Sequence, residues 1–89
     1  MIKEKSFNQT IENERKISSL KKLIESNQML LDGYERELSD CNKTIGNLSP
    51  RNYIYDEQVK ARNKILEKIG SCNQYEKGLR EKLAELEKN

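Results

Sequence analysis

Two heptad repeats of mainly apolar residues, one on each side of Ser49 and Pro50, constrain the fold of this chain more than any other feature. In both repeats the residues recur in steps of three and four, which is the spacing of a coiled-coil seam along one helix face. The first seam is Ile17, Leu20, Ile24, Asn27, Leu31, Tyr34, Leu38, Cys41, Ile45 and Leu48. The second seam is Tyr55, Gln58, Arg62, Ile65, Ile69, Cys72, Glu76, Leu79, Leu83 and Leu86.

The segment between the seams predicts a reversal of the chain. Ser49 is a good helix N-cap residue, and Pro50 suits the first position of a helix. Folding there places Leu48 opposite Tyr55 beside the turn and Ile17 opposite Leu86 at the far end, with the other layers in step between them. The sequence therefore predicts an all-α fold, an antiparallel two-helix coiled-coil hairpin with its turn near residues 49–54, which associates into a dimer or a helical bundle.

A polar layer supports this register. Asn27 interrupts the first seam and falls opposite Glu76 in the second, a coincidence that a shift of one heptad removes. Polar residues inside a coiled-coil seam commonly fix the register at some cost in stability. We therefore expect Asn27 and Glu76 to hold the two helices in this alignment.

The same pattern sets the expected boundaries along the chain. Residues 17–48 form helix one, 49–54 the turn and 55–87 helix two. Phe7 and Ile11 fall out of phase with the first seam, and helix two ends before it can cover them. Residues 1–16 are therefore expected to form an N-terminal arm or a short separate helix, with disorder as the alternative.

Composition limits the class of protein. The chain has 89 residues, of which 34% are apolar and 36% charged, and this is too polar for a thick globular core. Its formal net charge of +2 is far from the strongly basic field of a dedicated nucleic-acid binder. No apolar run approaches the ~18 residues of a membrane span, and the Lys-rich start lacks the apolar segment of a secretory signal. We expect a cytoplasmic protein.

The residues that usually carry catalysis are missing. There is no histidine, no Gly-rich phosphate loop and no nucleophile with a neighbouring base. Cys41 and Cys72 lie several layers apart in the proposed register, roughly 15 Å at ~1.5 Å per residue, so they are expected to be free thiols. Neither has the neighbours that a metal site requires. The sequence predicts no enzyme activity, no cofactor and no bound metal.

Apolar residues outside the seams are the candidates for oligomerisation or partner binding. They occur beside the seam far from the turn, near the turn, and on the N-terminal arm. The alternative is that they only broaden the seam. The candidates are Phe7, Ile11, Leu23, Met29, Leu30, Ile54, Val59, Leu66 and Tyr75.

A group of basic residues near the two chain ends supplies candidate phosphate contacts. Glutamates are interleaved with it, which favours a solvated surface of mixed charge over a phosphate-binding patch. The candidates are Arg15, Lys16, Lys21, Lys22, Arg80 and Lys82.

These patterns favour a non-catalytic protein-binding module, a small adaptor or inhibitor that binds another protein, itself, or both. The abundance of Asn, Lys and Ile, without His or Trp, is typical of a phage or mobile-element accessory protein that acts on a host factor. Two alternatives stay open. One is a dimeric helical-hairpin regulator that binds nucleic acid, and the other is an oligomer that sequesters a small ligand.

Overall fold

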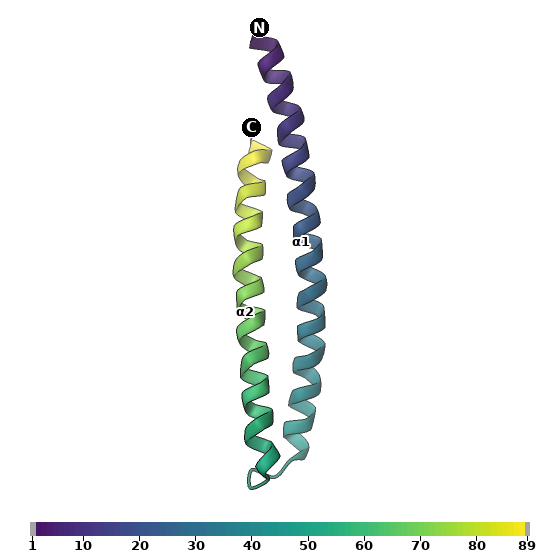
Figure 1. Cartoon of the computed structure of the whole chain (residues 1–89), viewed down its shortest axis with the longest axis vertical. Helices are drawn as coiled ribbons and strands as arrows, with labels where there is room; N and C mark the ends of the chain where they lie inside the picture. Colours follow the sequence, from purple (N-terminus) through teal and green to yellow (C-terminus); the bar gives the residue numbers. More distant parts are fainter. Residues whose placement is uncertain (1, 89) are drawn as a thin grey trace.

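Two long antiparallel helices make up the part of the chain that the structure describes. The computed structural model describes the backbone of residues 2–88 and the side chains of residues 9–88. Helix α1 spans Ile2–Asn47 and helix α2 spans Tyr53–Lys88, and they lie side by side along their length (Figure 1). The molecule is a rod of 74 × 15 × 14 Å. The predicted all-α helical hairpin is confirmed.

The core is the thin seam between the helices. Every residue of the two predicted seams is buried or half-buried, whereas most residues outside them are exposed. The best-protected apolar side chains are those of Ile24, Ile65, Cys72 and Leu79, each 5% to 8% exposed. Burial therefore follows the heptad spacing, which is the physical reason that this polar sequence folds as a hairpin.

Hydrogen bonds within the short connection decide where α2 begins. The Ile54 amide donates to the Asn52 side-chain oxygen at 3.0 Å, which makes Asn52 the N-cap of α2. The Ser49 hydroxyl instead accepts from the Arg51 amide at 3.3 Å, inside the turn. Helix α2 thus begins at Tyr53, which shortens the turn expected over residues 49–54, because Asn52 caps the helix in place of Ser49.

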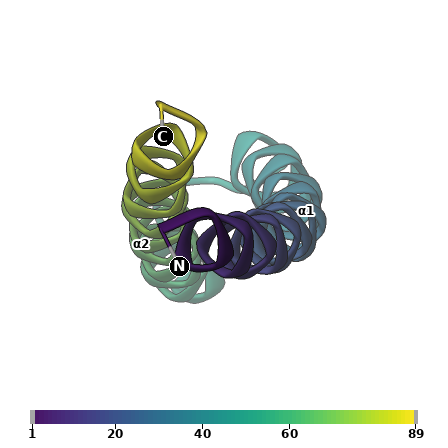
Figure 2. The same ribbon diagram turned by 90° about the horizontal axis from the view of Figure 1, so that it is seen from above.

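The N-terminal segment belongs to the first helix. Helix α1 passes without a break through the expected boundary between residues 16 and 17. It extends beyond the last turn of α2, and its N-terminal end leans toward the α2 side of the rod (Figures 1 and 2). Ile11 is half-buried on this segment, while the side chain of Phe7 lies outside the described part of the structure.

The polar seam residues make contacts that differ from the expected pairing. The Asn27 side-chain amide donates to the backbone carbonyl of Cys72 at 2.9 Å. Glu76 accepts through Oε2 from Arg80 Nε at 3.0 Å, one helical turn further along α2. Among the described residues, no hydrogen bond joins Asn27 to Glu76. The polar layer forms a cross-helix contact, but to the backbone.

A cation–π contact and two free thiols also lie at or beside the seam. Lys68 Nζ lies 5.6 Å from the centre of the Tyr34 ring, a cation–π contact between the two helices. Cys41 is half-buried and Cys72 is buried, and both are free thiols. Within residues 2–88, neither helix contains the long apolar stretch that crossing a lipid bilayer requires.

Candidate functional site

One side of the hairpin carries a row of exposed apolar side chains, here called the apolar flank and defined by Leu23, Leu30 and Tyr75. Each of these residues directly precedes the first of the two seam positions of its heptad, and in an antiparallel pair the residues at that place lie on the same flank. Their exposed fractions are 44%, 49% and 51%. Met29, next to Leu30, is 71% exposed. Leu23, Leu30 and Tyr75 therefore expose apolar side chains along one flank of the hairpin.

The other predicted apolar residues do not join this surface. Leu66 and Val59 each follow a seam residue, which places them on the opposite flank. Leu66 is 46% exposed, whereas Val59 is half-buried. Ile54 directly precedes the seam residue Tyr55, which places it on the side of the apolar flank, but it is half-buried and lies beside the turn, about twenty residues along α2 from Tyr75. The candidate binding residues thus divide between two flanks, and the larger group of exposed ones lies on the apolar flank.

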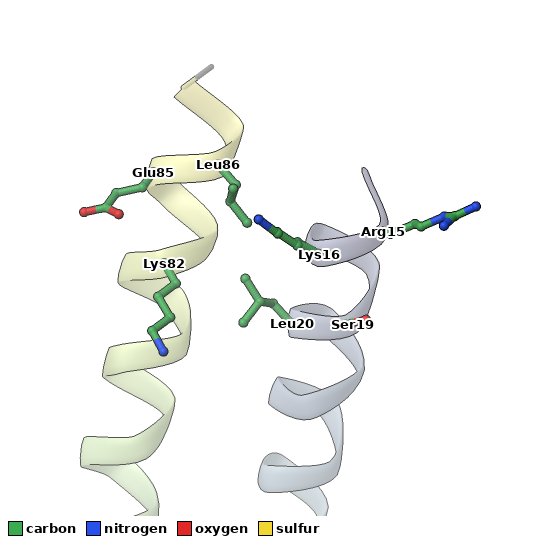
Figure 3. A pocket seen from close by; sticks show the side chains of 7 residues that line it. All are labelled: Arg15, Lys16, Ser19, Leu20, Lys82, Glu85 and Leu86. Carbon is green, nitrogen blue, oxygen red and sulfur yellow. The ribbon is translucent and has the colours of Figure 1, made fainter. Parts of the chain in front are cut away.

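A groove of about 470 Å³ lies between the helices at the open end of the hairpin. Leu20 from α1 and Leu86 from α2 project into the space between the helices and form its apolar floor (Figure 3). Lys16 and Lys82 directly precede seam residues, as the residues of the apolar flank do. The groove therefore opens on the apolar flank, beyond Leu23. Its lining residues are Arg15, Lys16, Ser19, Leu20, Lys82, Glu85 and Leu86.

Three basic side chains and one acidic side chain line the groove, and they point in different directions. The Lys16 side chain extends across the gap toward α2, and Lys82 borders the groove from α2 (Figure 3). Arg15 and Glu85 point away from the space between the helices. The charges closest to the apolar floor are therefore two ammonium groups. This combination suits a ligand with an apolar body and a nearby anionic group.

The residues of the predicted basic cluster lie in different places on the hairpin. Lys21 and Lys22 line a separate shallow cleft of about 360 Å³, together with Glu14 and Glu25. Arg80 forms the ion pair with Glu76 described above. Only Arg15, Lys16 and Lys82 share the groove at the open end. The six candidate phosphate contacts consequently do not form one surface.

Some residues of the site were not singled out from the sequence. Leu20 and Leu86 read only as ordinary seam residues, yet they form the floor of the groove. Their position in the last layers of the seam, just before α2 ends, could have indicated a groove there, because the end of a seam is the part least covered by neighbouring side chains. Tyr53, which is 81% exposed beside the turn, was not among the predicted binding residues either.

The remaining site chemistry is limited. Within the described part of the chain, no three His, Cys, Asp or Glu side chains are grouped so that they could hold a metal ion. The chain matches no protein-family model, no curated protein and no solved structure.

Proposed function

We propose that the chain is a non-catalytic protein-binding module, a small adaptor or inhibitor that docks onto another protein through the apolar flank. The observation that carries this proposal is the row formed by Leu23, Leu30 and Tyr75, each about half exposed on one side of the hairpin. Exposed apolar side chains gathered along one side of a small polar rod are typical of a protein interaction site.

The geometry of the row favours a helical partner. Leu23 and Leu30 are seven residues apart, or roughly 10.5 Å along α1 at ~1.5 Å per residue. Tyr75 lies on the same flank from the facing helix. A third helix that packs along this flank would cover all three side chains and convert the two-helix hairpin into a bundle with a thicker core.

The distribution of charge supports a protein partner over nucleic acid. The basic residues occur on two flanks, and Glu14 and Glu25 accompany those of the second cleft. A surface that tracks a phosphate backbone needs its cations on one side. The residues of the apolar flank, by contrast, all lie on one side of the hairpin.

A pair of matched substitutions tests the proposal. Leu30→Glu alters the apolar flank, and Leu66→Glu alters the opposite flank at a residue of nearly equal exposure, 49% against 46%. Both side chains are exposed, so both variants are expected to keep the helical content and cooperative unfolding of the parent chain. Each tagged variant is expressed in the cells that naturally produce the chain and recovered with nuclease present, and its solution mass is measured.

We expect the parent chain and Leu66→Glu to recover the same stoichiometric protein partner, and Leu30→Glu to lose it. If the partner is a second copy of the chain, the loss appears as a halved solution mass. Equal recovery by Leu30→Glu and the parent chain would contradict docking through the apolar flank. Recovery of nucleic acid alone would contradict a protein-binding function.

A further inference from the structure

We infer that the groove at the open end of the hairpin receives an acidic amphipathic helix of a partner protein. This inference rests on the proposed function and adds the chemistry of the partner. Its basis is the apolar floor of Leu20 and Leu86 with Lys16 and Lys82 beside it.

The position of the groove indicates what kind of ligand fits it. It lies at the end of the apolar flank, so a helix packed along Leu30 and Leu23 reaches the floor of the groove in its next turns. A volume of about 470 Å³ between two helices accommodates side chains that project from such a helix. The partner helix therefore carries an apolar stripe with heptad spacing, whose end inserts between Leu20 and Leu86.

The lysines define the charge of that helix. Lys16 extends over the groove from α1 and Lys82 borders it from α2, while the carboxylate of Glu85 points away (Figure 3). A helix lying between the two lysines presents one edge of its apolar stripe to each of them. Glutamate or aspartate along both edges would pair with the ammonium groups, and lysine or arginine there would be repelled.

The same charges disfavour a second copy as the occupant. Among the positions that directly precede the first seam position of each heptad, three carry lysine (Lys16, Lys68 and Lys82) and one carries glutamate (Glu37). Two copies that meet through this flank bring surfaces of like charge together. An acidic helix from a different protein meets the complementary charge.

A designed peptide is a direct probe of this inference. The acidic probe is a labelled 21-residue helix, in which each heptad has leucine at its two seam positions. The four positions nearest this leucine stripe carry glutamate. The matched basic probe carries lysine in place of every glutamate. Binding of each peptide to the full chain is measured by fluorescence anisotropy at low and at high salt.

The protein variants are chosen as a matched set. Lys16→Gln with Lys82→Gln removes the two charges beside the floor, and Lys21→Gln with Lys22→Gln removes two charges from the separate cleft. All four lysines are exposed, and circular dichroism checks that both variants remain helical. Leu30→Glu is included as the variant that tests the apolar flank itself.

We expect the acidic peptide to bind the parent chain and the basic peptide to bind at least about tenfold more weakly, with the difference shrinking at high salt. Lys16→Gln with Lys82→Gln should weaken binding of the acidic peptide by about tenfold, and the control pair should leave it unchanged. Equal binding of the two peptides, or equal effects of the two lysine pairs, would overturn the inference.

Two further outcomes separate this inference from the proposed function. If Leu30→Glu abolishes recovery of the natural partner but neither lysine pair affects peptide binding, the groove is not the acidic-helix site and the proposed function stands. If a 20-nucleotide single-stranded RNA binds through Lys16 and Lys82 and the acidic peptide does not bind, the groove contacts phosphate and the inference is wrong.

Discussion

Asn27 of α1 is joined to Cys72 of α2 by a hydrogen bond of 2.9 Å from the Asn27 side-chain amide to the Cys72 carbonyl. Asn27 is only 6% exposed, so its amide has little access to water and depends on this acceptor. The bond links side chain to backbone across the seam. It therefore favours one alignment of the two helices over alignments that place an apolar side chain at this level.

Removing this amide should weaken the hairpin. We expect Asn27→Ala to lower the free energy of unfolding by about 1 kcal/mol, because a buried hydrogen bond is lost. The exposed neighbour Gln28→Ala should change it by less than ~0.5 kcal/mol. Urea unfolding followed by circular dichroism measures both. Equal effects of the two substitutions would show that the Asn27 bond contributes nothing specific.

Glu76 is expected to be a destabilising member of the seam. Its Oε1 atom is buried and has no hydrogen-bond partner among the described residues, while Oε2 is bound by the half-exposed Arg80. An unsatisfied buried polar atom costs ~1–3 kcal/mol, whereas an exposed ion pair contributes only ~0–1 kcal/mol. Glu76→Leu should therefore raise the free energy of unfolding by about 1 kcal/mol. Thermal unfolding tests this, and a lowered midpoint would contradict the account.

The N-cap residue Asn52 is expected to contribute to the stability of the hairpin. Asn52 accepts the Ile54 amide at 3.0 Å, so Asn52→Ala should cost about 1 kcal/mol of stability. Asn52→Asp keeps an acceptor at the same place and should preserve the parent stability. Ser49→Ala should have a smaller effect than Asn52→Ala, because the Ser49 hydroxyl acts within the turn. A larger effect at Ser49 would mean that the cap lies where the sequence first indicated it.

Gly33 offers a stabilising change. It lies inside α1, and an added Cβ there meets no atom within 4 Å. Glycine in a helix interior is about 1 kcal/mol less favourable than alanine. Gly33→Ala should thus raise the free energy of unfolding by up to ~1 kcal/mol without altering partner recovery. A loss of partner recovery in this variant would place Gly33 at an interface.

The seam was predictable from the sequence because burial follows spacing directly. Ile24 and Leu79, which the heptads place opposite each other, are among the most buried residues. The acceptor of Asn27 was not predictable, since two local details decide it: Arg80 engages the Glu76 carboxylate, and the Cys72 carbonyl is within reach of the amide. Spacing gives the level of a residue but not its hydrogen-bond partner.

The candidate site was predictable in a similar way. The position of Leu23, Leu30 and Tyr75 beside the seam places them on one flank, and each of them is about half exposed. The groove was not predictable, because it depends on how Lys16, Ser19 and the end layers pack around Leu20 and Leu86. The start of α2 was ambiguous for a simpler reason, since both Ser49 and Asn52 are good N-cap residues.

The alignment of the two helices defines the apolar flank and the groove, so disulfide crosslinking across the seam is the most direct test. In a chain whose Cys41 and Cys72 are replaced by alanine, Ile24→Cys with Leu79→Cys should oxidise to a crosslinked monomer in high yield. Ser26→Cys with Glu81→Cys, at exposed positions outside the seam, should not. Failure of the first pair to crosslink within one chain, or a crosslink only between chains, would contradict the hairpin register on which the account depends.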